Sequence, residues 1–137
     1  TVILNRLSEL LFTYALQHHI NEHHTEVGIM ALYAHDKLNK VIDAIHQQPE
    51  KPWTLEQLAA IAAQSRTSFA ESFREVSGWT AMNYITWWRM QLAWSKLSKG
   101  ETVAVTAYSV GYQSEAAFSR AFKKQFSLTA GQVRRGG

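Results

Sequence analysis

The C-terminal quarter of the chain gathers basic side chains that could bind a polyanion. Residues 102–137 have a net charge of +4, from one acidic residue and five basic ones: Glu115, Arg120, Lys123, Lys124, Arg134 and Arg135. Residues 1–35 sum to −2 and residues 36–101 to +1, so the whole chain of 137 residues carries only +3. A surplus of this size permits a nucleic-acid partner without requiring one.

The spacing of phenylalanines predicts how these basic side chains are presented. Phe118, Phe122 and Phe126 recur at every fourth position, which predicts a helix over residues 114–126 with one buried aromatic side. The opposite side would meet a partner through Ser114, Glu115, Ala116, Ser119, Arg120, Lys123 and Lys124. Arg120 could bind guanine O6 and N7 with both arms of its guanidinium; a phosphate contact or a solvated charge is the alternative. The two lysines are expected to contact phosphate.

A second helix of the same kind is predicted over residues 67–77, where Phe69, Phe73 and Val76 are spaced i, i+4, i+7. Its polar side would present Arg66, Thr67, Ser68, Ala70, Glu71 and Arg74. Glu71 stands where the other helix has Arg120. It could accept a hydrogen bond from cytosine N4, but pairing with Arg74 and facing no base is favoured. We therefore expect residues 114–126 to supply most of the affinity and residues 67–77 to be the more selective.

These two helices belong to an internal repeat with an offset of 49 residues. The matched pairs are Gln64 and Gln113, Ser65 and Ser114, Phe69 and Phe118, Phe73 and Phe122, and Thr80 and Thr129. Each unit reads as a short helix, a turn and a longer helix, which is the helix-turn-helix plan. The alternative is a pair of helical hairpins packed for stability alone. A helix over residues 80–99 would be about 30 Å long, close to the ~34 Å between successive major grooves.

The remaining elements are also predicted to be helical, which makes the fold all-α. Apolar residues at a 3-4 spacing predict a helix over residues 2–20, followed by a break at residues 25–28. Asp36 is the expected N-cap of the next helix, Thr54 and Gln57 form a capping box, and Gly78 is a C-terminal cap. We divide the chain into a linker helix (1–35), a first helix-turn-helix unit (36–79), a connecting helix (80–99) and a second unit (100–137).

Several other kinds of chemistry find no support in the sequence. The chain has no cysteine, which excludes disulfides and a thiol nucleophile, and no catalytic motif or phosphate-binding loop is present, so we expect no enzyme, cofactor or metal. His19 and His23 have a spacing that could ligate a metal but lack a third ligand, which favours a solvated face. No apolar run approaches a membrane span. Of the tryptophans in the connecting helix, Trp87 is expected to be exposed, with Trp88 and Trp94 packing against the two units.

Residues 36–135 resemble the DNA-binding domain of the AraC/XylS family of bacterial transcription regulators. The main motif is VGYQSEAAFSRAFKK at residues 110–124, supported by PWTLEQLA (52–59), SRTSFAESFR (65–74) and WRMQLA (88–93). LNRLSELL (4–11) is similar to the linker of members that carry an N-terminal cupin-type sensor domain, which is absent from this chain. Where the family has Gly, Pro and an aromatic residue near its C-terminus, this chain has Ser127, Ala130 and Val133, so the last helix could pack more loosely.

The resemblance implies two small homeodomain-like bundles that insert two recognition helices into successive major grooves. It implies a cytoplasmic, nucleoid-associated regulator of a promoter, most often an activator, with RNA polymerase as a further partner. The alternative is a helical protein-interaction module or anti-activator that has lost specific DNA binding. The apolar stripe at residues 4–14 fits a homodimer contact or a contact with a missing sensor domain, and it fits equally a fold back onto the bundle. Because the chain starts at Thr1, it could be a fragment of a longer protein.

Overall fold

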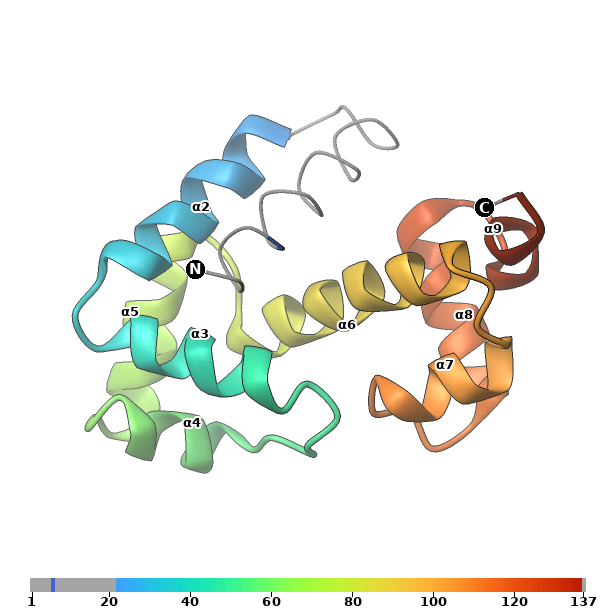
Figure 1. Cartoon of the computed structure of the whole chain (residues 1–137). Coiled ribbons are helices and arrows are strands. Elements are labelled where there is room, and N and C mark those ends of the chain that lie inside the picture. Colours follow the sequence, from blue (N-terminus) through green and yellow to red (C-terminus); the bar gives the residue numbers. More distant parts are fainter. Residues whose placement is uncertain (1–5, 7–21, 137) are drawn as a thin grey trace.

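A computed structural model describes residue 6 and residues 22–136 (Figure 1). This part of the chain is all-helical, as predicted, and contains α2 (Glu22–Ala34), α3 (Leu38–Gln47), α4 (Leu55–Ile61), α5 (Arg66–Ser77), α6 (Ala81–Ser98), α7 (Val103–Ser109), α8 (Glu115–Phe126) and α9 (Ala130–Gly136). Figure 1 shows two groups of helices at the two ends of α6. None of these helices is long and apolar enough to cross a lipid bilayer. The helix predicted over residues 2–20 lies outside the described residues.

The predicted repeat is present, with a shift of one residue in its first half. Ser65 and Ser114, 49 residues apart, are the N-caps of α5 and α8. Thr54 and Thr102, only 48 apart, are the N-caps of α4 and α7, and the predicted capping box at Thr54 is confirmed. The turn of the second unit is therefore one residue longer than that of the first.

The two long helices of the repeat end in the same backbone conformation. Gly78, after α5, has a φ of 81°, which confirms its predicted role as a cap. Ser127, after α8, has a φ of 61°, in the left-handed region that costs a residue with a side chain about 1–2 kcal/mol. The following helix packs nonetheless, because Ala130 and Val133 are both buried.

Helix α6 contributes side chains to the cores of both units. In its first half the ring of Tyr84 lies edge-on to Phe73 of α5. In its second half Trp94 stacks on Phe122 of α8 and lies 4.7 Å, centroid to centroid, from Phe126. The expected packing of the connecting helix against both bundles is thus confirmed.

The predicted exposure of Trp87 is wrong, because this side chain is only 4% exposed. Trp79, from the turn after α5, lies edge-on to the Trp87 ring at 5.5 Å, and Tyr84 lies one turn away at 5.8 Å. The turn at Gly78 folds Trp79 back over α6, and this cover could not be inferred from the periodicity of α6 alone.

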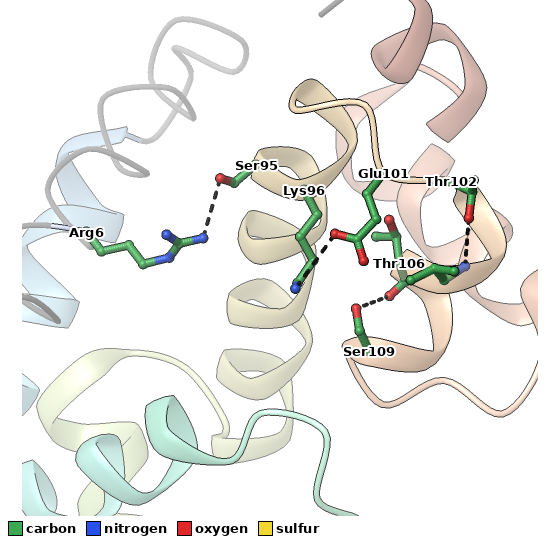
Figure 2. Close-up of polar contacts among 8 residues, drawn as sticks. Arg6, Ser95, Lys96, Glu101, Thr102, Thr106 and Ser109 are labelled. Carbon is green, nitrogen blue, oxygen red and sulfur yellow. Dashed lines mark hydrogen bonds and ion pairs between the residues drawn. The ribbon is translucent and has the colours of Figure 1, made fainter.

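A short set of polar contacts joins α6 to α7 (Figure 2). Lys96 and Glu101 form an ion pair at 3.9 Å across the loop. Thr102 Oγ1 accepts a hydrogen bond from the backbone N–H of Val105 and so begins α7. Arg6, close to the N-terminus, donates a hydrogen bond to Ser95 Oγ of α6 at 3.4 Å.

The break predicted at residues 25–28 is wrong, because α2 runs through it without interruption. Gly28 instead allows two helices to approach closely: a Cβ built on it would lie 2.5 Å from the carbonyl oxygen of Ser77, at the end of α5. Helix α2 packs on α3 and α5, and its Ile29 and Leu32 are buried in the core of the first unit.

The predicted N-cap at Asp36 is also wrong. The ring Nδ1 of His35 accepts from the backbone N–H groups of Lys37 and Leu38, at 3.2 Å each. This imidazole takes the place of the aspartate carboxylate at the start of α3, and no side chain of the N-cap residue itself bonds there.

We predict that Gly28→Ala destabilises the protein although alanine is the better helix former. The new methyl group would meet a backbone carbonyl that cannot move aside, so the overpacking outweighs the gain in propensity and the free energy of unfolding should fall by about 1 kcal/mol. Urea titration measures this change. Met30→Ala, at an exposed position of the same helix, should change it by less than about 0.5 kcal/mol. Equal or higher stability of Gly28→Ala would contradict the close approach.

A buried histidine joins α3 of the first unit to α2 and to α6. His46 of α3 lies with Nδ1 3.1 Å from the hydroxyl of Tyr33 on α2, and with Nε2 2.6 Å from the hydroxyl of Tyr84 on α6. Its ring stacks on Trp88 at 3.9 Å. A neutral imidazole has one donor and one acceptor nitrogen, so one tyrosine donates and the other accepts. Burial lowers the pKa of His46 to about 3.

We expect this histidine to make stability depend on pH. Between its unfolded pKa of 6.5 and its folded pKa of about 3, the unfolded chain binds a proton that the folded chain does not. The contribution of neutral His46 to the free energy of unfolding is therefore complete above pH 6.5 and is lost on acidification. The free energy of unfolding should fall by about 2 kcal/mol between pH 7 and pH 5. Urea titrations at both pH values test this, with His46→Gln as the comparison. Parallel pH profiles of the two proteins would rule out His46 as the cause.

Candidate nucleic-acid interface

Helix α5 presents the predicted polar side to solvent. Phe69 and Phe73 are fully buried, which fixes the rotation of the helix. All six predicted residues are exposed: Arg66, Thr67, Ser68, Ala70, Glu71 and Arg74. The structure therefore brings the first predicted set together on one surface.

Helix α8 repeats this arrangement with a more basic surface. Phe118, Phe122 and Phe126 are buried on one side. Of the seven predicted residues, Ser119 is partly buried, and six are exposed: Ser114, Glu115, Ala116, Arg120, Lys123 and Lys124. Arg120 has Ala116 one turn before it, so no bulky neighbour on that side separates its guanidinium from a docking surface.

The serines that precede the two helices serve as caps. Ser65 Oγ accepts from the backbone N–H of Ser68 at 3.1 Å, and Ser114 Oγ accepts from that of Ala117 at 3.0 Å. Each oxygen satisfies a backbone donor at the helix start. Ser114 is thus better placed to orient α8 than to read a base.

The charges on the two surfaces differ. Arg66 forms an exposed ion pair with Glu56 of α4 at 3.7 Å. In the described part of the chain Glu71 and Arg74 form no ion pair, so the favoured pairing of these two side chains is not found. The Glu71 carboxylate is open to solvent on the face that α5 would turn to a partner, whereas α8 presents Arg120, Lys123 and Lys124.

A cavity of about 290 Å³ lies between the C-terminal ends of α5 and α8 and the first half of α6. Arg74, in the last turn of α5, and Gln125, in the last turn of α8, both line it, together with Trp79 and Asn83.

Helix α6, which connects the two units, has 18 residues and is about 27 Å long. This length is comparable to the 34–36 Å between successive major grooves on one side of B-form DNA.

Two arginines outside the predicted set bond to backbone carbonyls. Arg134 of α9 donates through Nε to Gly100 at 3.2 Å, inside the second unit. Arg89 of α6 donates to Pro49 and Lys51, in the loop between α3 and α4. Sequence reasoning missed both, because a carbonyl acceptor has no residue-type signature; the only signal was the position of Arg89 in the WRMQLA motif.

The described residues contain no group of three His, Cys, Asp or Glu side chains that could hold a metal ion. The pair His19 and His23 cannot be judged, since the position of His19 and the side chain of His23 lie outside the described residues.

The comparisons with known proteins agree with this geometry. A helix-turn-helix domain family matches residues 58–136. Over 134 residues the chain is 40% identical to the RCS-specific HTH-type transcriptional activator RclR of Escherichia coli, a match that covers 96% of this chain and 47% of that protein. The chain spans about half the length of the curated relatives it matches.

Two solved structures share the fold. One is a transcriptional regulator with an AraC-type DNA-binding domain from Chromobacterium violaceum, with a TM-score of 0.68 and 20% identity over 72% of this chain and 89% of that one. The other is the DNA-binding domain of AdpA in complex with a target DNA, with a TM-score of 0.69 and 24% identity over 74% and 93%. These two structures show the shared fold. The family match over residues 58–136 confirms the resemblance seen in the sequence: the chain belongs to the AraC-type helix-turn-helix family.

Proposed function

We propose that this chain is the DNA-binding part of a transcription regulator and that α5 and α8 enter two successive major grooves of a promoter. The observation that carries the proposal is the presence of two capped helices with exposed polar sides on one shared helix about 27 Å long. A site read in this way spans about 15–20 base pairs. The structural relative AdpA, in complex with its target DNA, supports DNA as the partner.

Within this function α8 supplies most of the affinity. Arg120 reads a guanine, while Lys123 and Lys124 bind phosphate and make binding sensitive to salt. On α5 the unpaired carboxylate of Glu71 repels phosphate and accepts a hydrogen bond from cytosine N4, so this helix contributes selectivity more than affinity. Domain boundaries at residues 35, 79 and 99 accompany this assignment, with α2 packed on the first unit.

The proposal extends to a cytoplasmic protein that activates transcription. It would do so by contacting RNA polymerase. The support for this extension is the relative RclR, which is a transcriptional activator. A homodimer formed through the N-terminal helix or through a sensor domain outside this chain is part of the same proposal, because the matched relatives are about twice as long.

The competing function is a protein-interaction module without specific DNA binding, which the acidic Glu71 favours. A gel-shift titration against a random duplex library at two salt concentrations separates the two functions. Selective, salt-sensitive binding supports the regulator, and absence of binding at low salt refutes it.

We predict that Arg120→Ala weakens binding to the selected site by about 5- to 150-fold and relaxes the preference at one base pair, because a bidentate arginine–guanine contact contributes about 1–3 kcal/mol of discrimination. Selection and titration with the variant measure both effects. Lys124→Ala is the matched control on the same helix: it should weaken binding to all sequences alike and reduce the salt slope by about one. Unchanged affinity and preference for Arg120→Ala would remove Arg120 from base reading.

A further inference from the structure

Arg89, in the middle of α6, reaches out of its own helix to the first unit. Its Nε donates to the carbonyl oxygen of Pro49 at 2.7 Å, and its Nη2 donates to that of Lys51 at 2.9 Å. The guanidinium fork therefore holds two carbonyls of one short loop at once. Hydrogen bonds from a charged donor are about twice as strong as neutral ones, and Arg offers them in a fixed plane.

The loop that Arg89 binds is itself held in place. Lys51 O also accepts from the backbone N–H of Trp53 at 2.8 Å, and the Trp53 indole donates to Gln48 O at 2.9 Å. Two prolines, Pro49 and Pro52, restrict its φ angles. The arginine thus joins α6 to a rigid segment of the first unit.

The other side of the same guanidinium faces the second unit. At Gly111, in the turn between α7 and α8, an added Cβ would lie 2.9 Å from Cζ and Nη2 of Arg89 and 3.0 Å from the Cα of Glu50. The Arg89 Cζ also lies 6.0 Å from the centroid of the Tyr112 ring. The turn that precedes α8 therefore lies against both Arg89 and the loop of the first unit.

Burial of this group matters because it reduces competition from water. Desolvation lowers the pKa of Arg89, while Tyr112 and Glu50 oppose the shift. An arginine stays protonated in proteins, so the charge and all its donors remain available to the two loops. Arg89 thus bonds to Pro49 of the first unit on one side, and on its other side it occupies the space that a Cβ at Gly111 of the second unit would enter.

We propose that Arg89 is a positioning residue that fixes the relative orientation of α5 and α8, and thereby the separation of the two half-sites that the protein accepts. We call this set of contacts, from Arg89 to Pro49, Lys51 and Gly111, the Arg89 bridge. The bridge works beside α6: the helix sets the distance between the units, and the bridge restrains their rotation about it. This inference rests on the proposed DNA-binding function for its purpose, but not for its geometry.

The geometry can be tested without DNA. Because the chain has no cysteine, spin labels can be attached at two introduced cysteines, Ala60→Cys on α4 and Tyr108→Cys on α7, both exposed. Pulsed electron–electron double resonance then gives the distribution of distances between the two spin labels, and thus between the two units. We expect a narrow distribution in the parent, a distribution at least twice as broad in Arg89→Ala, and a partial return in Arg89→Lys, which keeps the charge but lacks the fork.

Arg134→Ala is the matched control, since it removes an arginine–carbonyl hydrogen bond that lies inside one unit. It should leave the distribution unchanged even if it lowers the melting temperature. Gly111→Ala keeps Arg89 but inserts a methyl group against it, and it should shift the mean distance; because Gly111 has a φ of 101°, an alanine there also strains the turn, so this variant only accompanies Arg89→Ala. An unchanged distribution in Arg89→Ala would overturn the bridge.

The DNA arm uses the site selected by the parent protein and versions with one base pair added or removed between the half-sites. Arg89→Ala should lose at least tenfold in affinity at the parent spacing and discriminate less among the three. Equal losses at all three spacings would overturn the positioning role. If the distribution broadens as expected but the parent selects no DNA, the proposed function fails and the bridge stands, so the two failures are distinguishable.

Discussion

Burial of α6 by both units is the constraint on which the rest of the structure depends. A surface helix ordinarily hides one apolar stripe, but α6 packs Tyr84 and Trp88 into the first core and Trp94 and Leu97 into the second. Two small bundles of about 40 residues share this helix, and domains of that size bury too small a fraction of their surface to be very stable alone. Apolar packing in the two cores therefore fixes the relative position of the polar sides of α5 and α8. The polar side chains themselves take no part in that packing.

Helix α2 belongs to this shared framework. Through Tyr33 it touches His46, and through His46 it is connected to Tyr84 of α6. Gly28 lets the same helix lie against the end of α5. The segment that precedes the first unit is thus linked through His46 to the start of α6 and lies directly against the end of α5.

The two units share a plan but differ in charge and in detail. Both α5 and α8 begin with a serine cap and bury phenylalanines one turn apart. The first presents Glu71 and the second Arg120 at matching positions, so repetition of the backbone does not produce repetition of the chemistry. The turn before α8 has one more residue, including Gly111, whose missing side chain leaves space for Arg89.

The sequence by itself determined most of the described helices, the caps at Thr54 and Gly78 and the exposed sets on α5 and α8, because those features depend on local periodicity and on residues three or four apart. The family followed from a motif of the same local kind. Only the tertiary structure decided that Gly28 is a point of close approach, that His35 caps α3, that Trp79 covers Trp87 and that Arg89 bonds to a distant loop. Each of these contacts joins residues from different elements, and most of them use a backbone carbonyl or an absent side chain that leaves no pattern in the sequence.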